Sequence, residues 1–368
     1  MFTLLLFLAS CGGGRGNSIS GVAGDTLRFR YACHISWVSY PHYSVVTLSN
    51  PWRKGGLLHT YVVVPRDSAL PANLPSGTLL RTPLKRLFVT ATVHANLIKW
   101  LGCVDVIKAV SDLKYMNIPE IQQGVSRGLI IDAGEGLNPD VERIVEAKPE
   151  ALFLMPFENG GYGQMEKLGA PLVECAEYME PAPLGEAEWM RFYGRLLGRG
   201  DAADSLFAVV EKNYLHDKAL ADTVKQRPTL LCELKTGSAW YVPGGKSTMG
   251  QLYRDAGARY LLGDNSNTGS VPLSFETIFS KGEKADMWLI KYHAPVDKSY
   301  RSLAAENRLY TRFAAFAHRS IWGCNLSVKP FYEETPFRPD YLLHDLIALF
   351  HPQIISPDSL RYYSKMNE

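Results

Sequence analysis

Short apolar segments alternate with helical segments in two separate parts of the chain, and this alternation constrains the fold more than any other feature. The apolar segments of the first part are residues 86–90, 106–110, 151–155 and 171–174, and those of the second are residues 229–233, 260–262 and 286–290. Helices are expected at residues 92–101, with Thr92 as the N-cap, and from about Ser247 onward. Strands that alternate with helices form parallel sheets covered by helices. The sequence therefore predicts an α/β fold.

The stretch between these two parts contains no strand candidate. Over residues 185–224 the apolar side chains, among them Trp189, Phe192 and Phe207, recur at helical spacing. A Gly-Arg-Gly sequence at residues 198–200 is expected to interrupt this pattern. The stretch predicts a long helical connection between two βα lobes.

The two lobes also share a local sequence pattern. Glu142 and Glu276 each begin a Glu-x-Ile-hydrophobic motif, and in both places an Ala follows nine residues after the Glu and an apolar strand candidate comes next. Two similar lobes joined by a helix enclose a cleft between them, and clefts between domains are the usual place for a ligand.

Two further regions precede the lobes. Residues 1–16 contain a short apolar run, the segment Leu-Ala-Ser-Cys that ends at Cys11, and a glycine-rich stretch. They are typical of an export signal and a flexible tether. In residues 17–82, Leu27, Phe29 and Tyr31 alternate with arginines, which predicts a β-rich extension. The expected domains are thus residues 1–16, 17–82, 83–183, 184–226 and 227–368.

Composition excludes several function classes. The formal net charge is +2 and no long run of Lys or Arg occurs, so nucleic acid is not expected as a partner. The cysteines are scattered without C-x-x-C spacing, which gives no support for a zinc or redox site. The glycine-containing loops at residues 134–136 and 160–163 do not complete a nucleotide-binding motif. No nucleophile–base pair can be nominated, so a lipid-anchored hydrolase is the weaker alternative and we expect no enzyme and no intrinsic cofactor.

Residues 82–350 resemble the helical-backbone class (class III) of periplasmic binding proteins, which carry vitamin B12, ferric siderophores and haem. The best-matched stretches are residues 138–154 and 242–252, and the segment that starts at Trp189 resembles the start of the connecting helix of that class. The resemblance implies a monomeric, exported protein of the periplasm that passes its ligand to an ABC permease coupled to an ATPase. The segment that ends at Cys11 resembles a lipobox, which implies a lipid anchor on Cys11.

The resemblance also implies roles for individual residues. An exposed Glu on each lobe docks into Arg pockets of the permease in this class, and these positions match Glu142 and Glu276, expected on the outer faces of the lobes. Loops after the strands should supply the ligand contacts. The candidates for these contacts are His94, Tyr115, Phe157, Tyr162, Trp240, Tyr241, Lys246, Tyr292 and His293.

The residue types leave the ligand open between an iron chelate, haem and cobalamin. Aromatic faces suit a large planar or macrocyclic ligand, Lys246 or Lys291 could meet an anionic group, and one His or Tyr could bind haem iron axially. Direct binding of a Zn, Mn or Fe ion is the alternative. His94 and His293 with Asp112 would form an incomplete set for a bare ion, because such sites draw three or four ligands.

Overall fold

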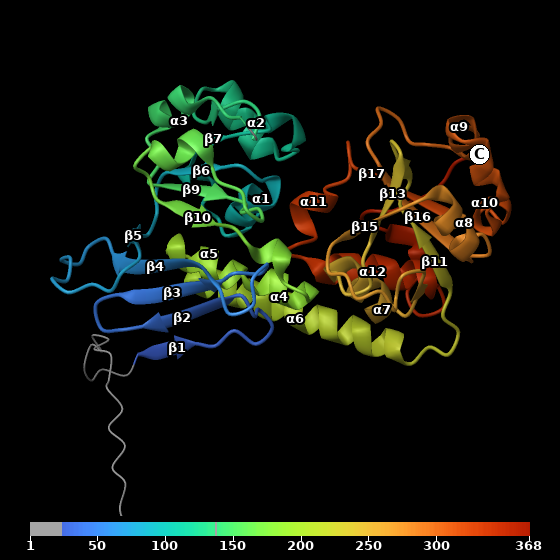
Figure 1. The fold of residues 1–368 in the computed structure, drawn as a ribbon, viewed down its shortest axis with the longest axis horizontal. Helices are drawn as coiled ribbons and strands as arrows, with labels where there is room; N and C mark the ends of the chain where they lie inside the picture. Colours follow the sequence, from blue (N-terminus) through green and yellow to red (C-terminus); the bar gives the residue numbers. More distant parts are fainter. Residues whose placement is uncertain (1–23, 137) are drawn as a thin grey trace, which may run out of the picture.

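The computed structural model describes residues 24–136 and 138–368, so Cys11 and the expected export signal lie outside the described residues. Two α/β lobes stand side by side, connected along their base by helices, and a separate sheet lies beneath the first lobe (Figure 1). The predicted α/β fold class with two lobes, a helical connection and a β-rich extension is confirmed. The limits of the five domains stay a prediction.

The first lobe is built on a parallel sheet of five strands in the order β10-β9-β6-β7-β8. Its strands are β6 (Leu87–Val89), β7 (Ile107–Val110), β8 (Ile131–Asp132), β9 (Ala151–Leu154) and β10 (Leu172–Glu174). Its helices are α1 (Thr92–Trp100), α2 (Pro119–Ser126) and α3 (Val141–Ala147), with short 3₁₀ turns that include η2 (Leu113–Tyr115), η3 (Gly163–Lys167) and η4 (Glu177–Met179). Every residue of β6 and β9 is buried, as expected for strands covered on both faces.

The second lobe repeats this plan. Its five-stranded sheet has the order β14-β11-β16-β17-β18, parallel except for β18. The strands are β11 (Thr229–Cys232), β14 (Arg259–Tyr260), β16 (Met287–Tyr292), β17 (Ile321–Asn325) and β18 (Ser364–Lys365), beside a small antiparallel sheet of β12 (Lys235–Thr236), β13 (Ala239–Pro243) and β15 (Ser270–Leu273). The helices are α7 (Thr248–Asp255), α8 (Phe275–Gly282), α9 (Tyr300–Glu306), α10 (Ala314–Ala317), α11 (Phe331–Glu334) and α12 (Pro339–Phe350).

Helices connect the lobes, as predicted. They are α4 (Pro183–Glu188), α5 (Met190–Leu196) and α6 (Gly200–Asp222), and α6 packs against α12 of the second lobe. The interruption expected at residues 198–200 separates α5 from α6, and Gly198 has a φ of 68°, a conformation in which glycine carries little strain. A second interruption at Trp189, between α4 and α5, was not predicted. None of the described helices combines the length and apolar character needed to cross a membrane.

The N-terminal sheet contains β1 (Asp25–Leu27), β2 (Ile35–Ser39), β3 (Ser44–Ser49), β4 (Leu57–Pro65) and β5 (Thr78–Thr82) in sequence order. The alternation over residues 27–31 does not produce one continuous strand. After Leu27 the chain leaves the sheet, because the backbone N–H groups of Arg30, Tyr31 and Ala32 donate to the buried carboxylate of Glu188 at 2.8–3.0 Å. Tertiary hydrogen bonds thus override the local strand pattern.

The motif shared by the two lobes corresponds to the same local structure in each. Glu142 and Glu276 lie in the first turns of α3 and α8, which are capped by the side chains of Asp140 and Ser274. The strand that follows is β9 in one lobe and β16 in the other. The expected N-cap of α1 is wrong. Ala91 occupies that position, and Thr92 is the first helical residue.

Candidate functional site

A pocket of about 760 Å³ lies between the two lobes, and we call it the cleft pocket. Its residues from the first lobe follow β6 and β7, and those from the second lobe follow β16 and β17 or belong to α11. The lining comprises Thr90, Ala91, Thr92, Asp112, Lys114, Tyr115, Met116, Asn117, His293, Leu326, Ser327, Lys329, Tyr332 and Glu333. Ligands of open α/β sheets bind at the carboxyl ends of the strands, which is where this pocket lies.

Two of the predicted ligand residues meet in the cleft pocket. Tyr115 ends η2, His293 follows β16, and their ring centroids are 6.2 Å apart although the residues belong to different lobes. Both side chains are exposed. Lys114 and Lys329 add a positive charge from each lobe, and Asp112 and Glu333 add carboxylates. The pocket therefore offers aromatic faces, nitrogen and oxygen donors for a metal, and charges of both signs.

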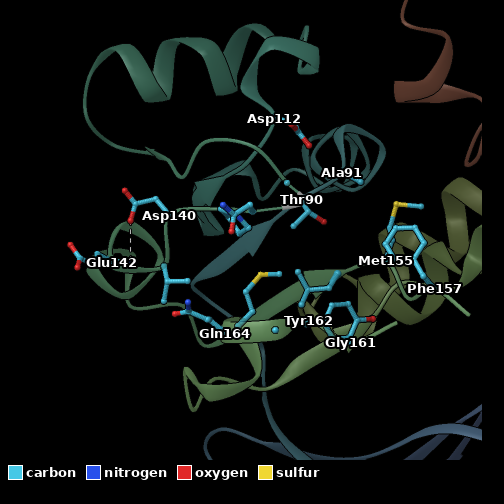
Figure 2. A pocket seen from close by; sticks show the side chains of 17 residues that line it. Thr90, Ala91, Asp112, Asp140, Glu142, Met155, Phe157, Gly161, Tyr162 and Gln164 are labelled. Atoms are coloured by element: carbon cyan, nitrogen blue, oxygen red, sulfur yellow. Dashed lines mark hydrogen bonds between the residues drawn. The ribbon is translucent and has the colours of Figure 1, made fainter. Parts of the chain in front are cut away.

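A second pocket, of about 710 Å³, continues from the cleft into the first lobe, and we call it the N-lobe pocket. It shares Thr90, Ala91 and Asp112 with the cleft pocket. Figure 2 shows the predicted residues Phe157 and Tyr162 on its walls. Phe157 is exposed, whereas the hydroxyl of Tyr162 donates to the carboxylate of Glu174.

A third pocket of about 440 Å³, the C-lobe pocket, shares Tyr332 with the cleft pocket. It contains the predicted ligand residue Tyr241, which is exposed, and Lys291. The ammonium of Lys291 forms an ion pair with Glu233 in the same wall. Burial opposes the charge on Lys291, but Glu233 outweighs burial and raises the pKa of the lysine. The charge of Lys291 is thus compensated within the protein before any ligand binds.

Three predicted ligand residues do not face the cleft, so these assignments are wrong. His94 is 1% exposed within α1, and Trp240 is fully buried among aromatic rings that include Trp288 and Phe313. Tyr292 is 8% exposed, and its hydroxyl accepts a hydrogen bond from the backbone N–H of Lys298. The side chain of a residue near a strand end can point into the core as readily as out of it. Lys246 is exposed but lines none of the three pockets.

The buried His94 belongs to a polar cluster in the core of the first lobe. Its Nε2 is 2.7 Å from a carboxylate oxygen of Glu177, and the other oxygen accepts a hydrogen bond of 2.5 Å from the hydroxyl of Tyr193. Burial opposes protonation of His94, but the neighbouring Cys175 and Glu177 outweigh burial and raise the pKa of the imidazole well above its ordinary value. Burial would raise the pKa of Glu177, yet His94 outweighs burial and lowers it. Both shifts favour the charged forms of the pair, and the hydrogen bond between them links α1 to η4.

Groups of three metal-ligating side chains occur at two places in the described part of the chain. They are His94 with Cys175 and Glu177, and Cys33 with His34 and Glu180. Neither group lines the cleft pocket. In the cleft, Tyr115, His293, Asp112 and Glu333 could each contribute one ligand atom to a metal inside a bound chelate.

The two proposed docking residues are both exposed. Glu276 lines none of the three pockets, and its own backbone N–H and the Ser274 side chain lower its pKa, which keeps the carboxylate charged. Glu142 does contribute to the N-lobe pocket, which differs from the expectation that it lies away from the ligand site. It occupies the end opposite Phe157, and its carboxylate points outward (Figure 2).

Sequence reasoning missed Lys114, Lys329, Tyr332 and Glu333 in the cleft pocket. Lys114 directly precedes the predicted Tyr115, so its place was available from the sequence. The other three lie in or just before α11, a single turn that reaches toward the first lobe, where the backbone carbonyl of Glu333 accepts a hydrogen bond of 3.0 Å from Asn96. No periodicity marks so short an element.

Several known proteins are similar to this chain. An uncharacterized lipoprotein of Methanocaldococcus jannaschii is 24% identical over 302 residues, which cover 78% of this chain and 70% of the relative. A second uncharacterized lipoprotein of that organism is 22% identical and covers 83% of this chain and 80% of the relative. The structure of a periplasmic heme binding protein from Pseudomonas aeruginosa matches with a TM-score of 0.60 at 17% identity, covering 77% of this chain and 99% of that chain.

A further solved structure, an ABC-type Fe³⁺-hydroxamate transport system from Saccharomonospora viridis, matches with a TM-score of 0.56 at 16% identity over 73% of this chain and 94% of that chain. The family model described as periplasmic binding protein matches residues 89–325, which include most of both lobes, the helical connection and nine of the fourteen residues of the cleft pocket. The chain is therefore a member of the periplasmic binding protein family.

Proposed function

We propose that this protein is a lipid-anchored substrate-binding protein of an ABC importer, which captures an iron chelate (a ferric siderophore or haem) or cobalamin and delivers it to a permease. The observation that carries the proposal is the cleft pocket, in which Tyr115 and His293 come from opposite lobes to the same space. A volume of about 760 Å³ is in the range of pockets that enclose ligands of several hundred daltons.

The chemistry of the cleft suits a chelated metal. His and Tyr are both axial ligands of haem iron, and Tyr115 and His293 are exposed to the pocket. Lys114 and Lys329 can bind the carboxylate arms of a chelate as point charges. Two structural neighbours, one named a heme binding protein and one a Fe³⁺-hydroxamate transport system, support the same ligand class.

The ligand class is tested by adding haemin, ferrioxamine B, cyanocobalamin, Zn²⁺ or Mn²⁺ separately to the purified protein. A ligand that binds the native state alone raises the melting temperature, and the coloured chelates also quench tryptophan fluorescence. We expect one chelate to do both. Stabilisation by a bare ion alone favours the direct metal-ion alternative, and no response to any of the five rejects the chelate proposal. Native mass spectrometry of protein purified from its own source identifies the ligand directly.

The lipid anchor is the second part of the proposal. Two relatives of this chain are named as lipoproteins, which supports lipidation at Cys11. The Cys11→Ser variant should lose incorporation of labelled fatty acid and be released from the membrane. Labelling that persists in the variant shows that Cys11 is not the acylated residue.

A further inference from the structure

Tyr162 connects the N-lobe pocket to the interior of the first lobe. Its ring lines the pocket, and its backbone N–H donates to Glu166 at 2.6 Å. Its hydroxyl does not face the pocket as a free donor, because it donates to the carboxylate of Glu174 at the end of β10. The orientation of this pocket wall therefore depends on what holds Glu174.

Glu174 is held by the N-terminal sheet. Its backbone N–H donates to the hydroxyl of Tyr61 at 2.7 Å, and one carboxylate oxygen is 3.9 Å from Nδ1 of His59. His59 and Tyr61 lie two residues apart on β4, so both side chains point to the same face of the sheet, and their rings stack with centroids 4.3 Å apart. Thr78 on β5 fixes His59 in turn, through a hydrogen bond of 2.7 Å to its Nε2.

The N-terminal sheet lies outside the part of the chain that matches the family model, since that match begins at residue 89. A series of side-chain contacts nevertheless connects Thr78 through His59 and Glu174 to Tyr162. One end of this series of contacts is a pocket wall, and the other is a pair of strands, β4 and β5, outside the matched residues.

The same contacts determine the protonation state of the Tyr162 hydroxyl. Burial, together with its hydrogen bond to Glu174, raises the pKa of Tyr162 far above that of a free tyrosine. The residue remains a neutral phenol whose single proton is already donated to Glu174. It offers the pocket an aromatic face.

We infer that Glu174 is a positioning residue for the ligand site, and that the N-terminal sheet sets the wall of the N-lobe pocket by holding Glu174 against Tyr162. This inference rests on the proposed function in one respect, that the ligand extends into the N-lobe pocket. The β-rich extension then supports the binding site from outside the pocket.

The test uses the full chain with 3-fluorotyrosine at position 162, so that the ¹⁹F resonance reports the environment of this ring without any ligand. The Glu174→Gln and Tyr61→Phe variants should both shift the resonance. Glu174→Gln replaces the carboxylate that accepts from the Tyr162 hydroxyl with a weaker acceptor, and Tyr61→Phe removes the hydroxyl that accepts from the backbone N–H of Glu174. Glu158→Gln is the matched control, since Glu158 is an exposed acid near the same pocket and should leave the resonance unchanged. An unchanged resonance in both Glu174→Gln and Tyr61→Phe overturns the inference.

The second readout is affinity for haemin, ferrioxamine B and cyanocobalamin. For a probe that binds, Glu174→Gln and Tyr162→Phe should each weaken binding about 5-fold, the usual effect of one lost hydrogen bond. The double variant should be no weaker than either single variant, because both remove the same contact. Additive losses contradict the inference. If no probe binds, the proposed function fails, and the fluorine resonance still decides whether Glu174 positions Tyr162.

Discussion

Tyr115 and His293 lie with their ring centroids 6.2 Å apart across the cleft, one on each lobe, and no covalent or hydrogen-bonded contact between these two side chains is present. This spacing is that of two aromatic rings in direct contact, for which centroids lie roughly 4.5–7 Å apart. A planar ligand between the rings needs such a contact on each of its faces. The two rings must therefore move apart, by rotation of these exposed side chains or by separation of the lobes, before such a ligand can enter between them.

The first prediction follows from this pair. Tyr115→Ala and His293→Ala should each weaken binding of the chelate that the screen identifies by about 10- to 100-fold, because aromatic residues at the centre of a binding site contribute a large share of the affinity. Fluorescence titration measures the change. If the ligand is haem and His293 binds its iron, His293→Ala should also shift the Soret band of the bound haem.

Tyr43→Ala is the control for this prediction. Tyr43 also stacks on another aromatic ring, that of Tyr40, but it lies between β2 and β3 in the N-terminal sheet and lines none of the three pockets. The affinity of the Tyr43→Ala variant for the chelate should equal that of the unmodified protein. Unchanged affinity in both cleft variants would place the ligand elsewhere.

The lobes and the connection could be predicted from the sequence because short apolar strands alternate with helices in both lobes and apolar residues recur at helical spacing between them. It could not predict which side chains near strand ends face the cleft. His94 and Phe157 both follow apolar strands, yet His94 turns into the core to reach Glu177, a residue 83 positions away, whereas Phe157 is exposed. Such choices depend on partners that only the tertiary structure brings close. Glu142 and Glu276 were simpler to place, since a residue in the first turn of a capped helix is commonly exposed.

The second prediction concerns the buried pair of His94 and Glu177. Glu177→Ala should lower the free energy of unfolding by about 3–5 kcal/mol, because it removes the partner of both the buried imidazole and the buried Tyr193 hydroxyl. Urea denaturation at pH 6 measures this. The exposed His42 supplies the matched control, and His42→Gln should stay within about 0.5 kcal/mol of the unmodified protein.

The same pair predicts a pH dependence. The folded-state pKa of His94 is raised above its ordinary 6.5, so its stabilisation is complete below pH 6.5 and is lost as the pH rises through the raised value. The pKa of Glu177 is lowered below 4.5, so its contribution is complete above pH 4.5 and is lost as the pH falls. The difference in stability between the unmodified protein and His94→Gln should be largest between pH 4.5 and 6.5. A difference that grows above pH 7 contradicts a charged pair.

The third prediction concerns the attachment of the N-terminal sheet to the helical connection. Glu188 is fully buried and accepts the backbone N–H groups of Arg30, Tyr31 and Ala32, while Arg191 binds the same carboxylate at 3.0 Å. Glu188→Ala should reduce the hydrogen-exchange protection of these three amides by about tenfold or more, because a segment without its hydrogen-bond partners opens locally.

Glu211 provides the comparison for this attachment. It contacts the same segment only through side chains, at 2.7 Å from Arg30 and 2.6 Å from the hydroxyl of Tyr31. Glu211→Gln should therefore keep the amide protection nearly intact. Equal loss of protection in both variants would show that the backbone hydrogen bonds to Glu188 are not what holds the segment.

The last prediction concerns docking to the permease. Glu142 and Glu276 are exposed in the first turns of α3 and α8, one on each lobe, so they can present two negative charges to one partner. Two charges fixed far apart on a rigid body determine orientation as well as attraction. Replacing both with Ala should reduce ligand uptake through the cognate importer roughly tenfold or more, since each missing acid would leave unpaired the permease Arg that the family resemblance implies. Each single replacement should have a smaller effect.

Ligand affinity separates docking from binding. Affinity should remain nearly unchanged in the double variant, although Glu142 borders the N-lobe pocket, because its carboxylate points outward from the end opposite Phe157. Glu146 and Asp264, also exposed acids on the two lobes, form the matched control pair, and their replacement by Ala should leave uptake intact. Full uptake in the Glu142→Ala, Glu276→Ala protein would refute the docking assignment. A loss of uptake that merely parallels a loss of affinity would instead assign Glu142 to the ligand site.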